Sequence, residues 1–377
     1  MSKNDEEHRR RHLMKILHIP TGGLFSDGIG TFIYSYLEYM DLSEIEVTIL
    51  ATNKPLLEDK LKFQVLGVQI VEIERKKSSI LAYMREFLEL LKVGKYDVVH
   101  VHGSSALMSI ELFIAKIMGV PVRIAHSHNT TCNHILLDRM LRPFFYTLYT
   151  QSWACGEKAG EWLFKDKRFK VIHNARDVEK YSFNPHLRRV FRTTHSLKEN
   201  TLALGHVGRF NIQKNHTFLL DLMDEMKCKQ KDVKLFLVGE GEKVEDVKRY
   251  VKERKLEDSI VFLNRYSDMQ SFISAMDIML LPSLYEGLPL VAIEWQINGI
   301  QSILSTTISD ECIFTNSIQQ LPIDNVSTWI KKAIEDFSYI NRLEKSRENI
   351  DLAQKSNYDI RIEAKKLEHE YKKLIGE

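Results

Sequence analysis

Two glutamates eight residues apart, Glu286 and Glu294, mark the part of this 377-residue chain where residue types and spacing indicate a ligand-binding site. A continuous apolar run over 278–281 precedes them and predicts a buried strand, and the stretch 290–300 predicts a helix. The unpaired N–H groups at the start of such a helix point towards the preceding loop and favour an anion. We therefore expect a phosphate at this turn, with one carboxylate before the helix and one inside it.

The loop between these two elements contains the residues that such a turn needs. Pro289 suits the first helical position, because its missing N–H would be unpaired there anyway. Gly287 lets the backbone turn sharply and come close to a ligand. A nucleotide sugar, with phosphates in the middle and hydroxyls at both ends, would fit between the two carboxylates. A strand–loop–helix corner with two solvated glutamates explains the same residues, and this segment alone leaves both interpretations open.

A second loop carries two cations that could share one anion. The apolar stretch 202–207 predicts a strand, 208–216 the loop after it, and 217–226 a helix. Arg209 and Lys214 stand five residues apart across that loop, so both can point at one phosphate. Arginine offers phosphate a rigid fork and lysine a point charge. Two independently solvated cations are the alternative.

A glycine-bearing loop near the N-terminus also suits a phosphate. Residues 15–19 predict a short strand, 21–30 the loop that includes Gly28, and 31–40 a helix. Strand, glycine-rich loop and helix is the layout that offers backbone N–H groups to phosphate. The glycine spacing matches neither GxGxxG nor the P-loop, so a flexible loop explains it equally well.

Histidines alternate along two predicted strands of the first half and continue past the strand ends. They are His100, His102, His126 and His128. Such a histidine is usually a satisfied core or surface residue, but at a strand end it could orient a sugar hydroxyl or carry a proton. Because the histidine clusters have no obvious carboxylate or cysteine partner, we expect no metal site there.

Apolar strands alternate with helices in both halves of the chain. This alternation predicts a parallel, doubly wound α/β sheet, in which ligands bind beyond the carboxyl ends of the strands. A chain of 377 residues is also too long for one ordinary core, so we expect two such domains. The predicted strands are 15–19, 47–50, 68–73, 98–101, 122–125 and 152–154 in the first half, and 202–207, 235–238, 260–263 and 278–281 in the second.

Composition narrows the class of protein. The net charge of +2, from 53 basic and 51 acidic side chains, does not suggest general nucleic-acid binding. No apolar run approaches the roughly 20 residues of a membrane span, and the polar N-terminus does not look like a secretory signal. Four scattered cysteines are typical of reduced thiols in a cytoplasmic protein. The basic tail and the arginine–aromatic segment 140–146 could touch lipid, although a solvated end and a core-packing helix are commoner explanations.

Several phrases of the sequence resemble those of the retaining family 4 glycosyltransferases, whose GT-B architecture has two doubly wound domains facing each other across a cleft. The resemblance runs from Met14 over nearly the whole chain and is greatest to the bacterial subgroup that builds capsular and exopolysaccharide repeats. The spacing of Glu286 and Glu294 matches the E-x7-E motif of the family. The other phrases are RIAHSHNT (123–130), ACGE (154–157), GRF (208–210) with QKNH (213–216), AMD (275–277) and PSLYEGLP (282–289).

The resemblance implies a role for each charged candidate. Glu286 would hold hydroxyls of the donor sugar, and Glu294 would hold the ribose hydroxyls. Arg209 and Lys214 would clamp the diphosphate, whose charge grows as the glycosidic bond breaks. Fixed cations at that place stabilise the transition state more than the ground state.

The remaining roles follow from the same resemblance. His128 matches the active-site histidine at a strand end of the N-terminal domain. The donor-binding residues would be Gly28 beside the phosphates, Gly239, Arg265 and Tyr266 in the nucleoside pocket, and Gly287, Leu288, Pro289 and Leu290, whose backbone would add N–H donors.

Charge, periodicity and composition indicate how the chain is divided, and the resemblance implies a role for each domain. We expect a disordered tail over 1–13, an acceptor-side domain over 14–177, a polar, irregular linker over 178–200, a nucleotide-sugar-binding domain over 201–357, and a final stretch 358–377 whose helix crosses back to the N-terminal domain.

Four residues depart from the pattern of the family. Asp27 stands where a second glycine is common, and Trp295 and Asn298 stand where small residues are common. Arg176 replaces an apolar residue and could alter the hinge or add a charge to the cleft. The chain also lacks Asp-x-Asp, the metal-holding motif of the other large glycosyltransferase architecture, which agrees with a metal-independent clamp of arginine and lysine.

The resemblance thus implies a retaining hexosyltransferase that needs no cofactor. It would move a sugar from a nucleotide diphosphate donor, expected to be UDP-linked, to a hydroxyl of a glycan or polyprenyl-linked acceptor in surface polysaccharide synthesis. Its place would be the cytoplasm, with peripheral contact to the inner membrane face. Two other functions remain open here: a nucleotide-sugar 2-epimerase, which handles the donor alone, and a non-catalytic donor-binding subunit.

Overall fold

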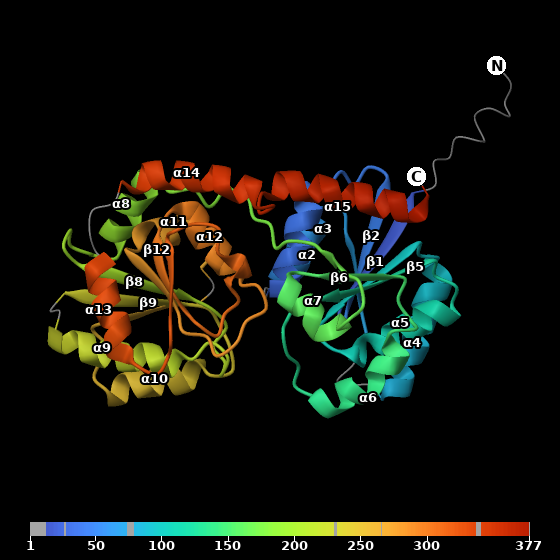
Figure 1. Cartoon of the computed structure of the whole chain (residues 1–377), viewed down its shortest axis with the longest axis horizontal. Coiled ribbons are helices and arrows are strands. Elements are labelled where there is room, and N and C mark those ends of the chain that lie inside the picture. The colour runs from blue at the N-terminus through green and yellow to red at the C-terminus, as the bar shows by residue number, and fades with distance from the viewer. Residues whose placement is uncertain are drawn as a thin grey trace, which may run out of the picture. The chain divides into compact units, whose positions relative to one another are not determined.

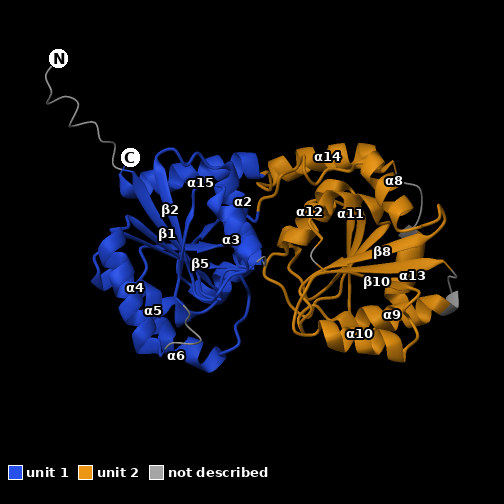
Figure 2. Ribbon diagram, turned by 180° about the vertical axis from the view of Figure 1, so that it is seen from behind, with its two compact units in different colours: residues 1–174, 360–377 blue, residues 175–359 orange. Residues whose placement is uncertain are grey.

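The computed structural model describes residues 13–25, 28–73, 79–229, 232–264, 266–336 and 341–376, without the side chains of 228, 229 and 336. The expected tail up to residue 12, Asp27 and Arg265 lie outside the described residues. The chain divides into two compact units, unit 1 with residues 1–174 and 360–377 and unit 2 with residues 175–359 (Figure 2).

Unit 1 is built on a parallel sheet. Within the described part of this unit the sheet has seven strands in the order β3-β2-β1-β4-β5-β6-β7 (Figure 1). Its strands are β1 (Met14–Pro20), β2 (Ile45–Ala51), β3 (Gln69–Glu72), β4 (Val98–Gly103), β5 (Val122–Ser127), β6 (Gln151–Ala154) and β7 (Lys170–Val171). Its helices are α2 (Gly28–Tyr39), α3 (Leu57–Gln64), α4 (Ile80–Gly94), α5 (Ser109–Ile117), α6 (Ile135–Phe145), α7 (Glu157–Phe164) and α15 (Ile360–Ile375), with a short 3₁₀ turn, η1 (Ala106–Met108).

Unit 2 repeats this plan with a smaller sheet. Among its described residues six parallel strands follow the order β10-β9-β8-β11-β12-β13. The strands are β8 (Leu202–Val207), β9 (Val233–Val238), β10 (Ile260–Leu263), β11 (Ile278–Leu281), β12 (Gln301–Ser305) and β13 (Ile318–Leu321). The helices are α8 (Pro185–Thr194), α9 (His216–Lys229), α10 (Val244–Glu253), α11 (Met269–Ala275), α12 (Leu290–Asn298), α13 (Val326–Asp336) and α14 (Arg342–Lys355), with the 3₁₀ turn η2 (Asp310–Cys312).

The predicted fold class, two doubly wound parallel α/β domains, is confirmed by these two sheets. The predicted strands coincide with observed ones to within two residues, because each is an apolar run bounded by turn residues. In every pairing between neighbouring strands that the structure describes, the strands are parallel, so their carboxyl ends open at one edge of each sheet.

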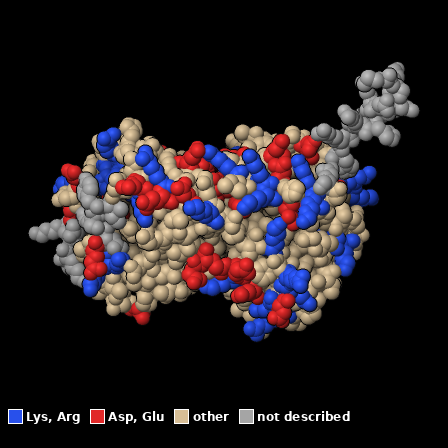
Figure 3. Space-filling view, turned by 45° about the horizontal axis from the view of Figure 1, so that its top comes forward, with Lys and Arg blue, Asp and Glu red and all other residues tan. Residues whose placement is uncertain are grey.

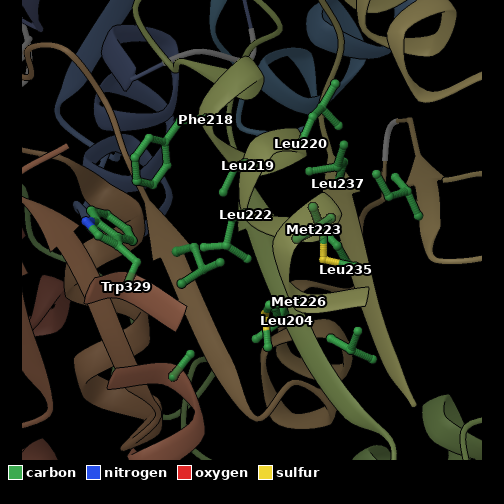
Figure 4. Packing of buried hydrophobic residues seen from close by; sticks show 14 of the residues in the cluster. Leu204, Phe218, Leu219, Leu220, Leu222, Met223, Met226, Leu235, Leu237 and Trp329 are labelled. Carbon is green, nitrogen blue, oxygen red and sulfur yellow. The ribbon is translucent and has the colours of Figure 1, made fainter. Parts of the chain in front are cut away.

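The core of unit 2 lies between the sheet and the helices packed on it. Aliphatic residues of α9 interlock with strand residues and with Trp329 of α13, as Figure 4 shows. Apolar residues recur along α9 at helical spacing, and a helix whose apolar stripe faces a sheet is stabilised mainly by that burial. This packing holds the start of α9, and with it the loop after β8, in place.

The last helix belongs to unit 1. After α14 the chain leaves unit 2, and α15 packs beside α2, as Figures 1 and 2 both show. Tyr371 of α15 is fully buried, and its hydroxyl lies 2.6 Å from Nδ1 of His100. The C-terminal segment is therefore part of the unit 1 core.

The prediction of an irregular linker over 178–200 is wrong. This stretch lies in unit 2 and contains α8, which Asn184 caps with its side chain and Pro185 begins. The polar residues that suggested a linker are engaged inside the unit: Arg188 and Arg192 both bind Asp277, at 2.6 and 3.2 Å. Arginines that pair with a buried carboxylate look like solvated residues in the sequence alone.

Charge is mixed on the face of the molecule shown in Figure 3, where acidic and basic side chains occur in small alternating groups.

No helix in the described part of the chain is both long and apolar enough to cross a membrane.

Candidate active site

The two central strands of the unit 2 sheet, β8 and β11, are neighbours although β9 and β10 separate them in the sequence. Strand order reverses between them, and in open parallel sheets ligands bind beyond the carboxyl ends of the strands at such a switch point. The loop 208–215 follows β8 and the loop 282–289 follows β11. The N–H of Leu284 donates to the carbonyl of Gln213 at 2.8 Å, which ties these two loops together.

Lys214 and Glu286 face each other across this switch point and form an ion pair. Nζ of the lysine lies 2.5 Å from Oε1 of the glutamate. Nε2 of Gln213 donates to the other carboxylate oxygen at 3.1 Å. Because Glu286 is only 8% exposed, little water screens this pair. The structure therefore brings two predicted site residues together and joins them directly.

Arg209 has a different partner. Its Nε lies 3.4 Å from Oε2 of Glu242, and both side chains are more than half exposed. An exposed pair of this kind contributes little to stability, so it can be exchanged for another partner at low cost. The joint binding of a diphosphate by Arg209 and Lys214 stays a prediction.

The loop after β9 packs backbone to backbone on the loop after β8. The N–H of Phe210 donates to the carbonyl of Glu240 at 2.8 Å. Gly239 has φ +144°, and a Cβ there would lie 2.1 Å from the carbonyl oxygen of Gly208. Only glycine permits this approach. The packing of the two loops is thus sufficient reason for glycine at position 239. The role of Gly239 in a nucleoside pocket stays a prediction.

Glu294, the second glutamate of the pair, is buried inside α12. Its Oε1 lies 2.6 Å from Arg176, one of the departures noted in the sequence. Arg176 also donates to the hydroxyl of Tyr181. Burial raises the pKa of Glu294, and the charge of Arg176 opposes that shift. The positive charge of Arg176 therefore balances the negative charge of Glu294, the carboxylate that is expected to bind the ribose.

The helix that carries Glu294 begins at Leu290, as predicted, but Pro289 precedes it instead of being its first residue. Pro289 is the N-cap of α12, Leu290 is the first helical residue, and no side chain caps the helix start. Gly287 and Leu288 are buried before it. The helix ends before Gly299, which has φ 73°, rather than at residue 300.

The two unusual residues of α12 are both accounted for. Trp295 is fully buried in unit 2. Asn298 donates to the carbonyl of Tyr181 at 2.9 Å and accepts from Arg342. Trp295 thus fills a buried position, and Asn298 links α12 to α14 and to the segment after Arg176.

Tyr266 packs on two helices. Its ring centroid lies 5.8 Å from Phe191 of α8 and 6.3 Å from Phe272 of α11. Partial burial raises the pKa of Tyr266. Because Arg265 lies outside the described residues, a nucleoside pocket formed by both stays a prediction.

In unit 1 the switch point lies between β1 and β4, and two candidates lie near it. Gly28 is the first residue of α2, is exposed, and a Cβ there would meet nothing within 4 Å. Unit 1 itself therefore does not require glycine at this position. His128 follows β5 and is half-buried. Its backbone N–H donates to the backbone carbonyl of Gly103 at 2.9 Å.

Behind His128 lies a cluster of buried histidines. Nε2 of His128 lies 2.9 Å from Nδ1 of His102, and Nε2 of His102 lies 2.9 Å from Nδ1 of His18. In a second line, Nε2 of His100 lies 3.1 Å from Nδ1 of His126. Burial lowers the pKa of His18 and of His128 to about 3, and it also lowers the pKa values of the other three well below the usual range.

Two triads of this cluster could hold a metal ion by spacing alone. The triads are His18, His100 and His102, and His102, His126 and His128, each with nitrogen atoms within 4.8 Å of one another. Neutral imidazoles are ligands for Zn²⁺ and related ions. The histidines of β4 and β5 have no obvious carboxylate or cysteine partner in the sequence and predict no metal site. His18 stands 84 residues before His102, so the sequence alone does not group it with them.

Comparison with known proteins decides the family. Residues 26–180 match the family described as Glycosyltransferase Family 4, and residues 188–351 match Glycosyl transferases group 1. The two matches together cover most of the chain. The protein is a family 4 glycosyltransferase of the GT-B fold.

The names of similar proteins agree with this family assignment. The Bacillus subtilis protein EpsF, named as a glycosyltransferase, is 29% identical over 310 residues, covering 79% of this chain and 80% of that protein. An Escherichia coli protein named UDP-Gal:alpha-D-GlcNAc-diphosphoundecaprenol alpha-1,3-galactosyltransferase is 23% identical, with 89% and 92% covered.

Solved structures show the same fold. A Rickettsia africae glycosyltransferase superposes with a TM-score of 0.75 at 15% identity, covering 96% of this chain and 99% of that one. Anabaena Alr3699/HepE in complex with UDP-glucose gives 0.76 at 14% identity, covering 96% and 100%.

Sequence reasoning missed three contributors to the site of this glycosyltransferase. Gln213 lies in a quoted motif but was given no role, although it binds Glu286. His206 lies under the loop after β8, with Nδ1 2.8 Å from the carbonyl oxygen of Leu280. His18 is a lone histidine in its strand, and only the register of β1 beside β4 brings it to the cluster.

The close approach at Gly239 predicts a large stability effect. Changing Gly239 to Ala should lower the free energy of unfolding by about 2–5 kcal/mol, because the methyl group meets the Gly208 carbonyl and the backbone is strained. Urea unfolding measures this difference. Gly28→Ala is the matched control and should change stability by less than about 1 kcal/mol. Equal stabilities for the two variants would contradict the packing of the two loops.

The buried histidines predict loss of stability in mild acid. Below about pH 6.5 the unfolded chain takes up protons that the folded cluster does not. The free energy of unfolding should therefore decrease from pH 7 to pH 5, by up to about 1.4 kcal/mol per pH unit for each buried histidine. His126→Gln should reduce this slope, whereas His134→Gln, at an exposed position, should not. A free energy of unfolding that stays level from pH 7 to pH 5 would refute a neutral cluster.

Proposed function

We propose that this protein is a retaining glycosyltransferase that uses a UDP-sugar and transfers the sugar to a hydroxyl of a glycan or lipid-linked acceptor. The observation that carries the proposal is the Lys214–Glu286 pair at the switch point of unit 2. It places a cation suited to a diphosphate beside a carboxylate suited to sugar hydroxyls. Support for UDP comes from solved relatives of the same fold that are described in complex with UDP.

Donor binding would use the groups on both sides of this pair. Lys214 would move from the carboxylate to the diphosphate, and Arg209 would give up its exposed partner Glu242 to join it. The uncapped start of α12 would add N–H donors from the segment that begins at Gly287. Glu286, with the lysine withdrawn, would accept hydrogen bonds from the sugar.

The nucleoside would occupy the other side of the site. Glu294 would bind the ribose hydroxyls, and Gly239 with Arg265 and Tyr266 would line the base. Arg176, already on Glu294, would keep that carboxylate ionised as the ribose approaches. In unit 1, Gly28 would leave room for the phosphates, and His128 would contact the sugar or the acceptor.

The reaction requires one bond to form and one to break on the same face of the sugar. The acceptor oxygen attacks the anomeric carbon while the bond to the diphosphate breaks, and the acceptor proton passes to the leaving phosphate oxygen. Lys214 and Arg209 would stabilise the growing phosphate charge, so that no metal ion and no cofactor are required. NMR of the product's anomeric configuration tests retention directly.

The named relatives suggest the pathway. Two similar proteins are named for amylovoran biosynthesis and for capsular polysaccharide biosynthesis, and the Escherichia coli relative is named for a diphosphoundecaprenol-linked acceptor. By this likeness the protein would extend a polyprenyl-linked saccharide in surface polysaccharide synthesis, in the cytoplasm and in contact with the inner membrane face. No nucleic-acid partner is expected, since charge is balanced.

An exposed apolar surface of unit 1 suits that membrane contact. We define the α6 patch as Ile135, Leu136, Leu137, Met140 and Phe144 of α6 with Phe113 and Ile117 of α5, all exposed. Leu136 and Met140 are 78% and 77% exposed. The exposed charge within α6 is Arg139, since its acid, Asp138, is buried against Arg142. Exposed apolar side chains beside a cation fit an anionic lipid surface.

The donor clamp predicts a specific pattern of activity. Lys214→Met should lower kcat/KM for a UDP-sugar at least about tenfold, which corresponds to about 1.4 kcal/mol of transition-state stabilisation. The double variant Lys214→Met with Glu286→Gln leaves no unpaired carboxylate and should be at least as impaired as Lys214→Met alone. Lys198→Met, at a position 79% exposed before β8, should be unaffected.

Three outcomes of this assay would contradict the proposal. Recovery of activity in the double variant would show that Lys214 serves only to neutralise Glu286. Conversion of the donor into a new sugar isomer without acceptor would identify an epimerase instead. If the purified protein turned over no donor, this result would identify it as a non-catalytic, donor-binding subunit.

The α6 patch predicts binding to lipid vesicles. Leu136→Ser with Met140→Ser should weaken binding to phosphatidylglycerol vesicles at least about tenfold, because two large apolar side chains no longer enter the interface. Flotation in a sucrose gradient measures the bound fraction. Val65→Ser is the matched control, since Val65 is 85% exposed but outside the patch. Equal flotation of patch and control variants would refute the assignment.

A further inference from the structure

One face of the unit 1 sheet carries five histidines where apolar side chains would be expected. His18, His100 and His102 come from β1 and β4, and His126 with His128 from the neighbouring β5 and its end. Register aligns His18 with His100 and His102 with His126. The rings of Phe32 in α2 and Tyr371 in α15 lie against them, and only His128 is partly exposed.

Three of these histidines form a single hydrogen-bonded chain. His18 Nδ1 meets His102 Nε2 at 2.9 Å, and His102 Nδ1 meets His128 Nε2 at 2.9 Å. A neutral imidazole has one N–H donor and one acceptor nitrogen. His102 must therefore donate from one nitrogen and accept at the other, and the whole chain must run in one direction.

The buried end of the chain selects that direction. His18 Nε2 is buried and has no hydrogen-bond partner among the described residues. If the chain ran from His128 to His18, this nitrogen would carry a hydrogen, and a buried N–H without a partner is rare and costly. If the chain runs from His18 to His128, the same nitrogen carries no hydrogen and is an acceptor without a donor. Leaving a buried acceptor unpaired is less costly than leaving a buried N–H unpaired.

We propose that His18 and His102 are positioning residues that fix His128 as the tautomer protonated on Nδ1. His102 donates to His128 Nε2, so the only hydrogen of the neutral His128 ring is on Nδ1. His128 can then donate a hydrogen bond from Nδ1, while its acceptor nitrogen is already engaged. This inference rests on the proposed function: in sugar transfer, His128 would donate to a sugar or acceptor oxygen and would not take the acceptor's proton.

The nitrogen distances favour this chain over a shared metal ion. Two imidazole nitrogens bound to one Zn²⁺ at about 2.0–2.1 Å in tetrahedral geometry lie roughly 3.3 Å apart. The chain distances of 2.9 Å are shorter than that and match hydrogen bonds. His102 belongs to both candidate metal triads, and both of its nitrogens are engaged in the chain.

Nitrogen-15 NMR of the histidine rings tests the proposal on the purified full-length protein without any assay of activity. In the wild type, long-range ring correlations should show His18, His102 and His128 each protonated on Nδ1 and not on Nε2. His128 protonated on Nε2 would overturn the direction of the chain. Stoichiometric zinc by elemental analysis, with zinc-bound nitrogen shifts on His102, would overturn the chain altogether. The wild-type spectrum is decisive even if a variant fails to fold.

Variants extend the test to the reaction. His102→Leu should remove the Nδ1–H signature of His128 and lower kcat about tenfold, with KM for the donor changed less than about twofold. His100→Gln is the control: it removes a buried histidine of the same cluster that is outside the chain, and it should leave the His128 signature in place. An unchanged signature in His102→Leu would contradict the positioning role. A correct signature in a protein that transfers no sugar would reject the proposed function and keep the tautomer.

Discussion

The site depends on one topological constraint: each sheet is parallel and reverses its strand order between two neighbouring central strands. At that reversal the loops leave in opposite directions and open a crevice beyond the carboxyl ends. In unit 2 it joins the loops after β8 and β11, which are more than 60 residues apart in sequence, and brings Lys214 to Glu286. In unit 1 it brings the ends of β1 and β4 together and sets His18 beside His102. The chemistry of both units follows from which residues these strand ends carry.

Within unit 2, both motif glutamates are held by a cation of the same unit. Glu286 pairs with Lys214, and Glu294 pairs with Arg176. Removing a carboxylate from water is costly unless a cation compensates it. Each pair therefore gives a buried acid a compensating cation within hydrogen-bond distance. Unit 1 buries histidines in place of charged acids, and several of their ring nitrogens pair with one another.

Sequence predicted the fold well because strand-like runs and helices alternate clearly. It placed the strands to within two residues and named both Lys214 and Glu286 as site residues. It failed where polar residues are buried: α8 looked like a linker because Arg188 and Arg192 are satisfied by Asp277, some 85 residues away. It also could not foresee that Arg176 binds Glu294 or that His18 completes a chain, since those contacts depend on long-range register. Arg209 pairs with Glu242 at the surface, and its predicted binding of a diphosphate stays a prediction.

The most direct measurement is a crystal structure of the protein soaked with UDP. Phosphate oxygens should lie within about 3 Å of Lys214 Nζ and of the Arg209 guanidinium, with the ribose against Glu294. A nucleotide bound elsewhere, with Lys214 still on Glu286 alone, would contradict this arrangement.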